Sequence, residues 1–235
     1  MLARKSADSG PLTRSLPTRT EFIFGRALPL AAFGFLVYIQ GSLTLGGIRQ
    51  AMAGQLDRAT TMYLINRVLA LVFFTCVFLI YVIRRSAVGK DHSVGAILSA
   101  MLGTLILYSL WLLPEGRTDN LYVLALSDML LSAGMVQAIY GVAHLRHRFS
   151  IVPEARGLVT TGPYGMVRHP IYFGEIIAAL GMIIPSLFSI HLAVLALFIA
   201  AQLRRTVYEE RVLRAAFPAY AAYARRVRRL IPFVF

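Results

Sequence analysis

The chain has 235 residues, 57% of them hydrophobic, and a mean hydropathy of +0.66. This composition excludes an ordinary soluble domain and is typical of a membrane protein. The 24 Lys and Arg residues outnumber the 11 Asp and Glu residues, which gives a formal net charge of +13. Because the cations lie between apolar segments, they indicate a positive-inside bias and contact with anionic lipids rather than binding of nucleic acid. The one cysteine, Cys76, excludes an intrachain disulfide.

Six apolar segments follow a polar, basic stretch, residues 1–20, which we expect to be a cytoplasmic tail. A membrane-spanning helix needs about 20 predominantly apolar residues. The segments run over residues 27–45, 62–83, 94–114, 121–143, 171–188 and 190–203. The last two are short and meet near Pro185, which predicts a tight hairpin. The sequence therefore predicts an all-α fold, a polytopic membrane bundle of about six transmembrane helices, with four of them in residues 21–143.

The basic residues predict how this bundle lies in the membrane. If the amino terminus is cytoplasmic, nearly all Lys and Arg residues fall in tails and loops on the cytoplasmic side, and the other side holds Arg49, Arg58 and Arg117. This asymmetry favours six spans with both termini in the cytoplasm. The cations are almost all Arg, which is typical of a GC-rich bacterium. We therefore expect a multi-pass protein of the bacterial inner membrane.

Residues 162–172 form the most unusual stretch between apolar segments, with the sequence Gly-Pro-Tyr-Gly-Met-Val-Arg-His-Pro-Ile-Tyr. Two prolines and two glycines predict a rigid turn, and Pro170 fits the first turn of the helix that follows. Backbone that is not helical must be buried in protein or line a polar cavity when it lies at membrane depth. The stretch therefore predicts a binding site at a membrane face, on the same cytoplasmic side as the carboxyl tail.

A second polar stretch begins at Leu203, where the pattern changes from wholly apolar to amphipathic, as in a helix that leaves the bilayer. Arg205 and Glu209 are four residues apart, so they share a helix face. Glu209 and Glu210 are adjacent acids at the point where the last apolar segment ends. They fit either a solvated helix face or part of a site.

The carboxyl segment beyond this helix is rich in tyrosine and arginine. Pro218 predicts the end or a kink of the helix. Tyr220, Tyr223 and the arginines within residues 225–229 then have the composition of an interfacial anchor on lipid headgroups.

These motifs, in this order, resemble the isoprenylcysteine carboxyl methyltransferase family and its bacterial relatives. The resemblance rests on the turn at residues 162–172, the acids at 209–210 with Leu213, the later Phe217, Tyr220 and Tyr223, and the runs at 149–160 and 231–233. Members are integral membrane enzymes that use S-adenosylmethionine. The resemblance covers residues 144–235 and implies a catalytic region there, with a helical hairpin and an amphipathic carboxyl segment. It also implies a cofactor that enters from the cytosol and a lipophilic or membrane-associated acceptor that arrives between helices.

The resemblance implies roles for individual residues. Arg205 and Glu209 stand where the family has a catalytic Arg–Glu pair, with Arg205 orienting an acceptor carboxylate and Glu209 holding Arg205 or the acceptor. Glu210 is the alternate for catalytic or cofactor work. Glu175, one turn into the fifth apolar segment, would contact the substrate. The residues expected to bind the cofactor are Gly162, Pro163, Tyr164, Arg168, His169, Tyr172, Glu210 and His144.

Simpler interpretations stay open for several of these residues. Tyr164 and Tyr172 also fit an aromatic belt at the membrane surface, and His169 also fits a backbone hydrogen bond at a helix start. His144 and His147 lie near one another in sequence, but no nearby acid or thiol completes a ligand set, so we expect no metal site.

Three functions are compatible with these sequence features. The first is a methyltransferase that moves a methyl group from S-adenosylmethionine to a lipophilic or small acceptor, such as the carboxylate of an isoprenylcysteine. The second is an NADPH-dependent reductase related to membrane sterol reductases, which the chain length disfavours. The third is a transporter or scaffold, which the concentration of polar residues at one cytoplasmic corner disfavours. No strand, Gly-x-Gly-x-Gly turn and helix occur in succession, so a soluble-type nucleotide fold is not expected. No oligomeric state follows from the sequence.

Overall fold

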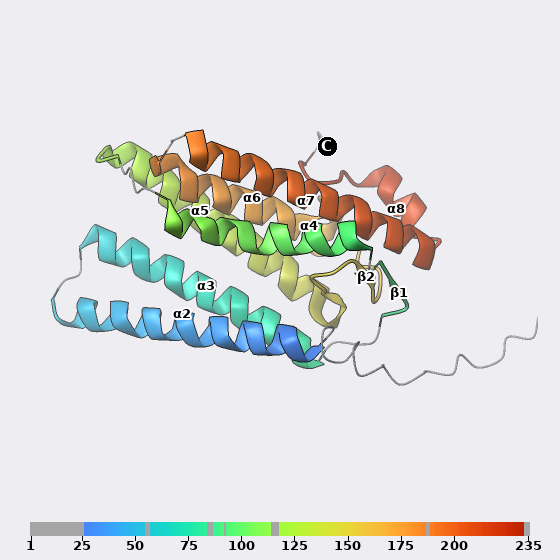
Figure 1. Ribbon diagram of the computed structural model, residues 1–235, viewed down its shortest axis with the longest axis horizontal. Helices are drawn as coiled ribbons and strands as arrows, with labels where there is room; N and C mark the ends of the chain where they lie inside the picture. Colours follow the sequence, from blue (N-terminus) through green and yellow to red (C-terminus); the bar gives the residue numbers. More distant parts are fainter. Residues whose placement is uncertain are drawn as a thin grey trace, which may run out of the picture.

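The structure is a computed structural model that describes residues 26–54, 57–83, 87–91, 93–113, 118–186 and 189–232 (Figure 1). The tail expected at residues 1–20 lies outside these described residues. The helices are α2 (Leu28–Met52), α3 (Arg58–Ile83), α4 (Val94–Leu105), α5 (Leu121–Leu145), α6 (Pro170–Ile183), α7 (Ser189–Ala216) and α8 (Tyr220–Arg226). Short 3₁₀ turns are η2 (Ile106–Leu112), η3 (Arg146–Arg148), η4 (Gly162–Gly165) and η5 (Ile184–Ser186), and the strands are β1 (Gly89–Lys90) and β2 (Glu154–Ala155).

Each of the six apolar segments is helical over nearly all of its described residues, and the fold is nearly all-α, with two two-residue strands beside the helices; the prediction of an all-α fold is confirmed to that extent. Four helices are long and apolar enough to cross a membrane: Leu28–Met52, Arg58–Ile83, Leu121–Arg148 and Ile190–Ala216. The other two apolar helices, Val94–Leu110 and Pro170–Ser186, are shorter. The length and composition of these helices are those of an integral membrane protein. The six spans and the two cytoplasmic termini stay predictions.

The last long helix, α7, extends well beyond the apolar segment at residues 190–203 and ends at Ala216. Pro218 follows two residues later, and the residue before a proline is disfavoured in helical conformation, so the predicted helix end is confirmed. The extension carries the arginines and the acid pair past the apolar part of the helix. It thereby sets them at the end of the bundle where α8 lies (Figure 1).

The closest helix contact joins α5 to α6 along most of their lengths. A Cβ atom added to Gly174 would lie 2.6 Å from the backbone nitrogen of Ala138, and one added to Gly134 would lie 2.4 Å from that of Ala178. The hydroxyl of Ser127 also donates to the carbonyl of Gly181 at 2.6 Å. Small residues of this kind let membrane helices approach closely. The contact fixes where the turn before α6 meets the end of α5.

The remaining helices flank this pair. α3 packs on α5 and carries α2 on its far side, while α4 packs on α7 (Figure 1). The two strands pair antiparallel, with Gly89 opposite Ala155 and Lys90 opposite Glu154. This short ladder ties the connection after α3 to the segment before the turn. It lies against α7, at the same end of the bundle as the polar residues of that helix.

A Gly174→Ala substitution tests the α5–α6 contact. The added methyl group meets backbone atoms of α5 that cannot move aside, and overpacking of this kind costs about 1–3 kcal/mol. We expect a lower midpoint of thermal unfolding in detergent. The control is Gly41→Ala in α2, where nothing lies within 4 Å of the added atom. Because alanine favours the helix by up to about 1 kcal/mol over glycine, this variant should be as stable as the parent or more so. Equal midpoints for the two variants would contradict the close contact.

Candidate active site

The turn before α6 begins with a glycine that the fold requires. Gly162 has φ +61°, a conformation that favours glycine. A Cβ atom there would lie 2.4 Å from Cδ2 of His144, at the end of α5. The imidazole of His144 in turn bonds through Nδ1 to the carbonyl of Tyr140 at 3.0 Å. The close contact of Gly162 with His144 therefore fixes the distance between the turn and the end of α5.

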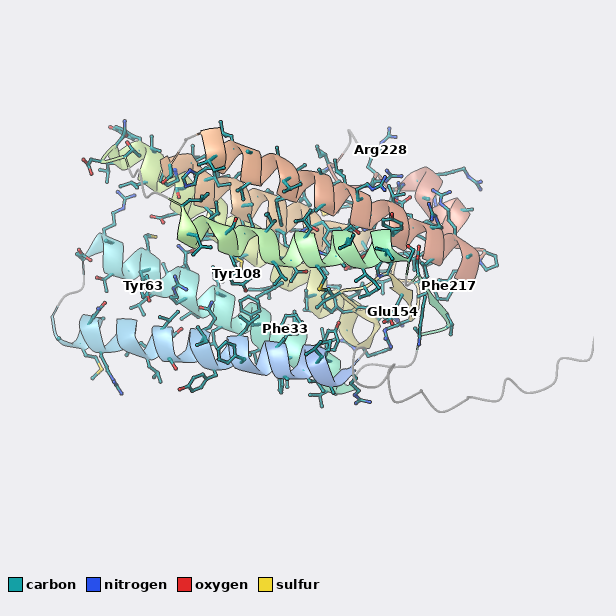
Figure 2. The ribbon with its side chains drawn as sticks, in the orientation of Figure 1. Phe33, Tyr63, Tyr108, Glu154, Phe217 and Arg228 are labelled. Carbon is teal, nitrogen blue, oxygen red and sulfur yellow. The ribbon has the colours of Figure 1, made fainter. Side chains whose placement is uncertain are left out.

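The last described residues run beside this turn. Val167 and Arg228 form a parallel β-bridge, and the amides of Arg168 and His169 donate to the carbonyls of Arg228 and Arg229 at 2.8 and 3.0 Å. These bonds bring the segment after α8 against the start of α6. The turn and the carboxyl segment, about sixty residues apart in the sequence, thus form one structure at the end of the bundle, where Figure 2 labels Arg228 and Glu154.

Glu210 holds the turn and the carboxyl segment together. It is buried, and its carboxylate accepts from Arg168 Nε at 2.9 Å, from Arg229 Nε at 3.1 Å and from Arg214 Nη2 at 3.3 Å. The Nε2 atom of His169 lies 3.4 Å from the same carboxylate. Arg168 also donates through Nη1 to the carbonyls of Ala224 and Val227, both at 2.7 Å. The charge of Glu210 is therefore satisfied within the chain.

Glu209, the neighbouring acid, faces a different set of groups. It accepts a hydrogen bond from the hydroxyl of Tyr172, and His169 Nδ1 lies 3.5 Å from its Oε2. The His169 and Tyr172 rings are stacked, with centroids 5.6 Å apart and planes at 11°. The guanidinium carbon of Arg205 lies over the Tyr172 ring, 4.6 Å from its centroid. One acid thus serves the fold and the other belongs to an aromatic and polar cluster.

A pocket of about 750 Å³, its open mouth included, lies against this cluster. Its walls come from the end of α5, the segment before the turn, the turn, the start of α6, α7 and α8. The charged and aromatic lining residues are Arg148, Phe149, Glu154, Tyr164, Arg168, His169, Tyr172, Glu209, Tyr220 and Tyr223, and the others include Leu145, Val152, Leu158, Val159 and Leu213. Within the described chain, the buried hydroxyl of Tyr220 has no hydrogen-bond partner. The pocket therefore offers groups of both charges and several aromatic rings to a ligand.

Five of the residues expected at the site line this pocket: Tyr164, Arg168, His169, Tyr172 and Glu209. The other expected residues lie close by but not in its wall. Gly162 and Pro163 build the turn and His144 supports it, while Glu210 is enclosed by arginines. Arg205 on α7 and Glu175 on α6 lie between these two helices, in the interior of the bundle. Their roles toward cofactor and substrate stay predictions.

Residues of the segment before the turn were not predicted to belong to the site, although Phe149, Val152, Glu154 and residues 157–159 form a whole wall of the pocket. The resemblance of residues 149–160 was the signal that could have found them. The prediction that Tyr220 and Tyr223 are interfacial anchors was wrong. Tyr220 is 1% exposed and Tyr223 4%, and the Tyr223 hydroxyl donates to the carbonyl of Tyr164 at 2.6 Å.

The environment of the turn shifts the ionisation of two of its groups. Burial disfavours the charged form of His169, but hydrogen bonds and charges from Glu209 and Glu210 outweigh burial and raise the pKa of the imidazole above its usual value. Burial, assisted by the charge of Glu209, raises the pKa of the Tyr164 phenol well above its usual value. His169 therefore tends toward the imidazolium and Tyr164 stays a neutral phenol.

Residues 122–219, from α5 through α7, match the family model described as phospholipid methyltransferase. The resemblance to membrane methyltransferases is confirmed for this region. The cobalt-zinc-cadmium resistance protein CzcN of Cupriavidus metallidurans is 35% identical over 132 residues, which are 55% of this chain and 59% of that protein. The similarity thus covers less than two thirds of that relative. The matched region contains the turn, α6 and Glu209, which supply much of the pocket wall. Among the described residues, no group of three or more His, Cys, Asp or Glu side chains could hold a metal ion.

A Glu210→Ala substitution tests the connection between the turn and the carboxyl segment. Removing one partner of a buried ion pair leaves uncompensated charge and typically costs about 3–5 kcal/mol. We expect residues 220–232 to exchange their amide hydrogens much faster, measured by mass spectrometry in detergent. Arg228→Ala is the control, because Arg228 joins the bridge through its backbone only. Unchanged protection in the Glu210 variant would contradict the role given to this acid.

The pH dependence of stability tests the charge of His169. A pKa raised by folding contributes stability below the unfolded pKa, about 6.5, and this contribution is lost as pH rises through the folded pKa. The stability lost in His169→Gln should therefore be larger at pH 5.5 than at pH 8.5. The measurement is thermal or denaturant unfolding in detergent at both values. A loss that grows with pH would show that His169 is held neutral.

Proposed function

We propose that this chain is an integral membrane methyltransferase that transfers a methyl group from S-adenosylmethionine to a lipophilic or small acceptor. The observation that carries the proposal is the coincidence of the methyltransferase-family match with the pocket, because the turn, α6 and Glu209 all fall within residues 122–219. The reductase and transporter alternatives gain no comparable support.

The pocket residues fit the chemistry of this cofactor. The pocket lining combines apolar walls with a few polar groups, as in most pockets that bind small molecules. A methionine carboxylate matches Arg148 or Arg168, and an ammonium or ribose diol matches Glu154 or Glu209. The rings of Tyr164, Phe149 and Tyr220 suit an adenine.

When bound, S-adenosylmethionine supplies an activated methyl group on its sulfonium. The contribution of this chain is to bind, orient and exclude water, since methyl transfer depends on an aligned approach of donor and acceptor. The Tyr172 hydroxyl and the Glu209 carboxylate form the polar end of the pocket, on the side that faces the interior of the bundle between α6 and α7. Arg205, buried behind the Tyr172 ring, is the cation we expect to act on an acceptor carboxylate that arrives from the membrane.

We further propose that the site faces the cytoplasm of a bacterium, at its inner membrane. The exposed arginines at the ends of α7 and α8, among them Arg211, Arg225, Arg226 and Arg228, support this orientation. They also suit contact with anionic lipids beside the site. The acceptor would then reach the pocket from the inner leaflet while the cofactor enters from the cytosol.

Isothermal titration calorimetry of the protein in detergent tests this function. We expect S-adenosylmethionine to bind, and Glu209→Ala and His169→Ala to weaken its affinity by about 10-fold or more, because each removes a charged or hydrogen-bonding partner worth about 1.5–3 kcal/mol.

Arg49→Ala, in the last turn of α2 and outside the pocket lining, serves as the control and should bind as the parent does. Clear NADPH binding with no heat from S-adenosylmethionine would favour the reductase instead. No binding of either nucleotide would remove the support for an enzyme with this pocket as its site.

A further inference from the structure

Three buried polar side chains lie behind the pocket, in the interior between α6 and α7. The Gln202 amide nitrogen donates to Glu175 of α6, and Arg205 Nη1 donates to the Gln202 carbonyl oxygen at 3.0 Å. Gln202 is 0% exposed and Arg205 4%. Gln202 thus bridges a carboxylate and a guanidinium that come from neighbouring helices. None of the three lines the pocket.

The bridge ends on groups that do belong to the pocket. Arg205 lies over the ring of Tyr172, and its Nη2 donates to the carbonyl of Ile151 at 3.2 Å. Tyr172 in turn donates to Glu209 and stacks with His169. A displacement of Arg205 would therefore change the support of the Tyr172 ring, and with it the position of the Glu209 carboxylate.

Helix α4 closes this cluster from a third side. A Cβ atom added to Gly103 would lie 2.9 Å from Gln202 Oε1 and 3.0 Å from Arg205 Cδ. The helix backbone thus packs directly on the bridge, which leaves Arg205 little freedom to move.

Stability alone gives a weak reason for such a cluster. Buried charged groups cost desolvation free energy, and apolar residues of similar volume often stabilise a fold as well or better. An arginine guided by a planar amide, however, has a defined orientation, and a small misplacement near reacting atoms costs much more in rate than in binding.

We infer that Gln202 and Glu175 are positioning residues, which hold Arg205 against Tyr172 and so orient the Tyr172 hydroxyl and Glu209 for methyl transfer. This inference rests on the proposed function. It gives Glu175 a role through Gln202 and Arg205 in place of direct contact with the acceptor.

The test uses membranes of cells that express the full chain, supplied with methyl-labelled S-adenosylmethionine, together with calorimetry of the purified protein. Gln202→Leu keeps the volume but removes both hydrogen bonds. We expect its labelling rate to fall by about 10²-fold while its affinity for S-adenosylmethionine changes by less than about threefold, since the loss concerns alignment and not cofactor binding. Glu175→Gln retains an oxygen that accepts from Gln202 and should restore most of the rate that Glu175→Leu loses.

Gly103→Ala is the second variant, for use if Gln202→Leu does not fold. It leaves every polar group in place and adds a methyl group in close contact with Gln202 and Arg205. We expect it to slow labelling as well, with cofactor affinity kept. The matched control is Gln40→Leu, which removes a glutamine of α2 that accepts from Arg67 Nη1 at 3.3 Å, far from the pocket. This variant should label membranes as the parent does.

Parent rates in Gln202→Leu or in a folded Gly103→Ala, equal losses of rate and cofactor affinity, or equal losses in Glu175→Gln and Glu175→Leu would each overturn the positioning role. A loss in Gln40→Leu as large as that in Gln202→Leu would do the same, because the effect would then be one of general destabilisation. If the parent chain neither binds S-adenosylmethionine nor labels membranes, the proposed function itself fails and the inference falls with it.

Discussion

The carboxylate of Glu210 joins three segments that are far apart in the sequence. It accepts hydrogen bonds from Arg168 in the turn, from Arg214 on its own helix and from Arg229 beyond α8. Arg168 extends the connection to two backbone carbonyls at the end of α8. Without this carboxylate, several cations would lie close together with no counter-charge, so the pocket wall formed by Tyr220 and Tyr223 depends on it. The exposed side of the cluster, at Arg214, adds less because water screens it.

Two adjacent acids on one helix can have different tasks because successive residues point about 100° apart around the axis. Glu210 points to the arginines of the turn and the carboxyl segment, and Glu209 points to Tyr172 and the pocket. His169 contacts both carboxylates through its two ring nitrogens. The imidazole therefore connects Glu210, which holds the turn to the carboxyl segment, with Glu209, which faces the pocket. The two carboxylates fix the position of the ring and also favour its charged form.

The membrane explains why the polar residues gather at one end. Apolar helices provide the frame, and the small residues of α5 and α6 allow them to meet closely enough to fix the turn. Polar groups inside such a frame are costly unless they are paired, and the Glu175–Gln202–Arg205 bridge pairs them across α6 and α7. The irregular backbone of the turn lies against the carboxyl segment and lines the pocket, as required where no helix satisfies the backbone.

The sequence by itself determined the membrane class, the six helical segments, the helix end before Pro218 and the two motifs that meet at the pocket. These features depend on local properties, namely runs of apolar residues, proline geometry and residue order. Only the tertiary structure decided which acid faces the pocket, that Tyr220 and Tyr223 are buried, and that residues 149–159 form a wall. The physical reason is that helix periodicity gives relative directions around an axis, whereas the packing of α5 on α6 and the ion pairs of Glu210 decide which direction meets which neighbour.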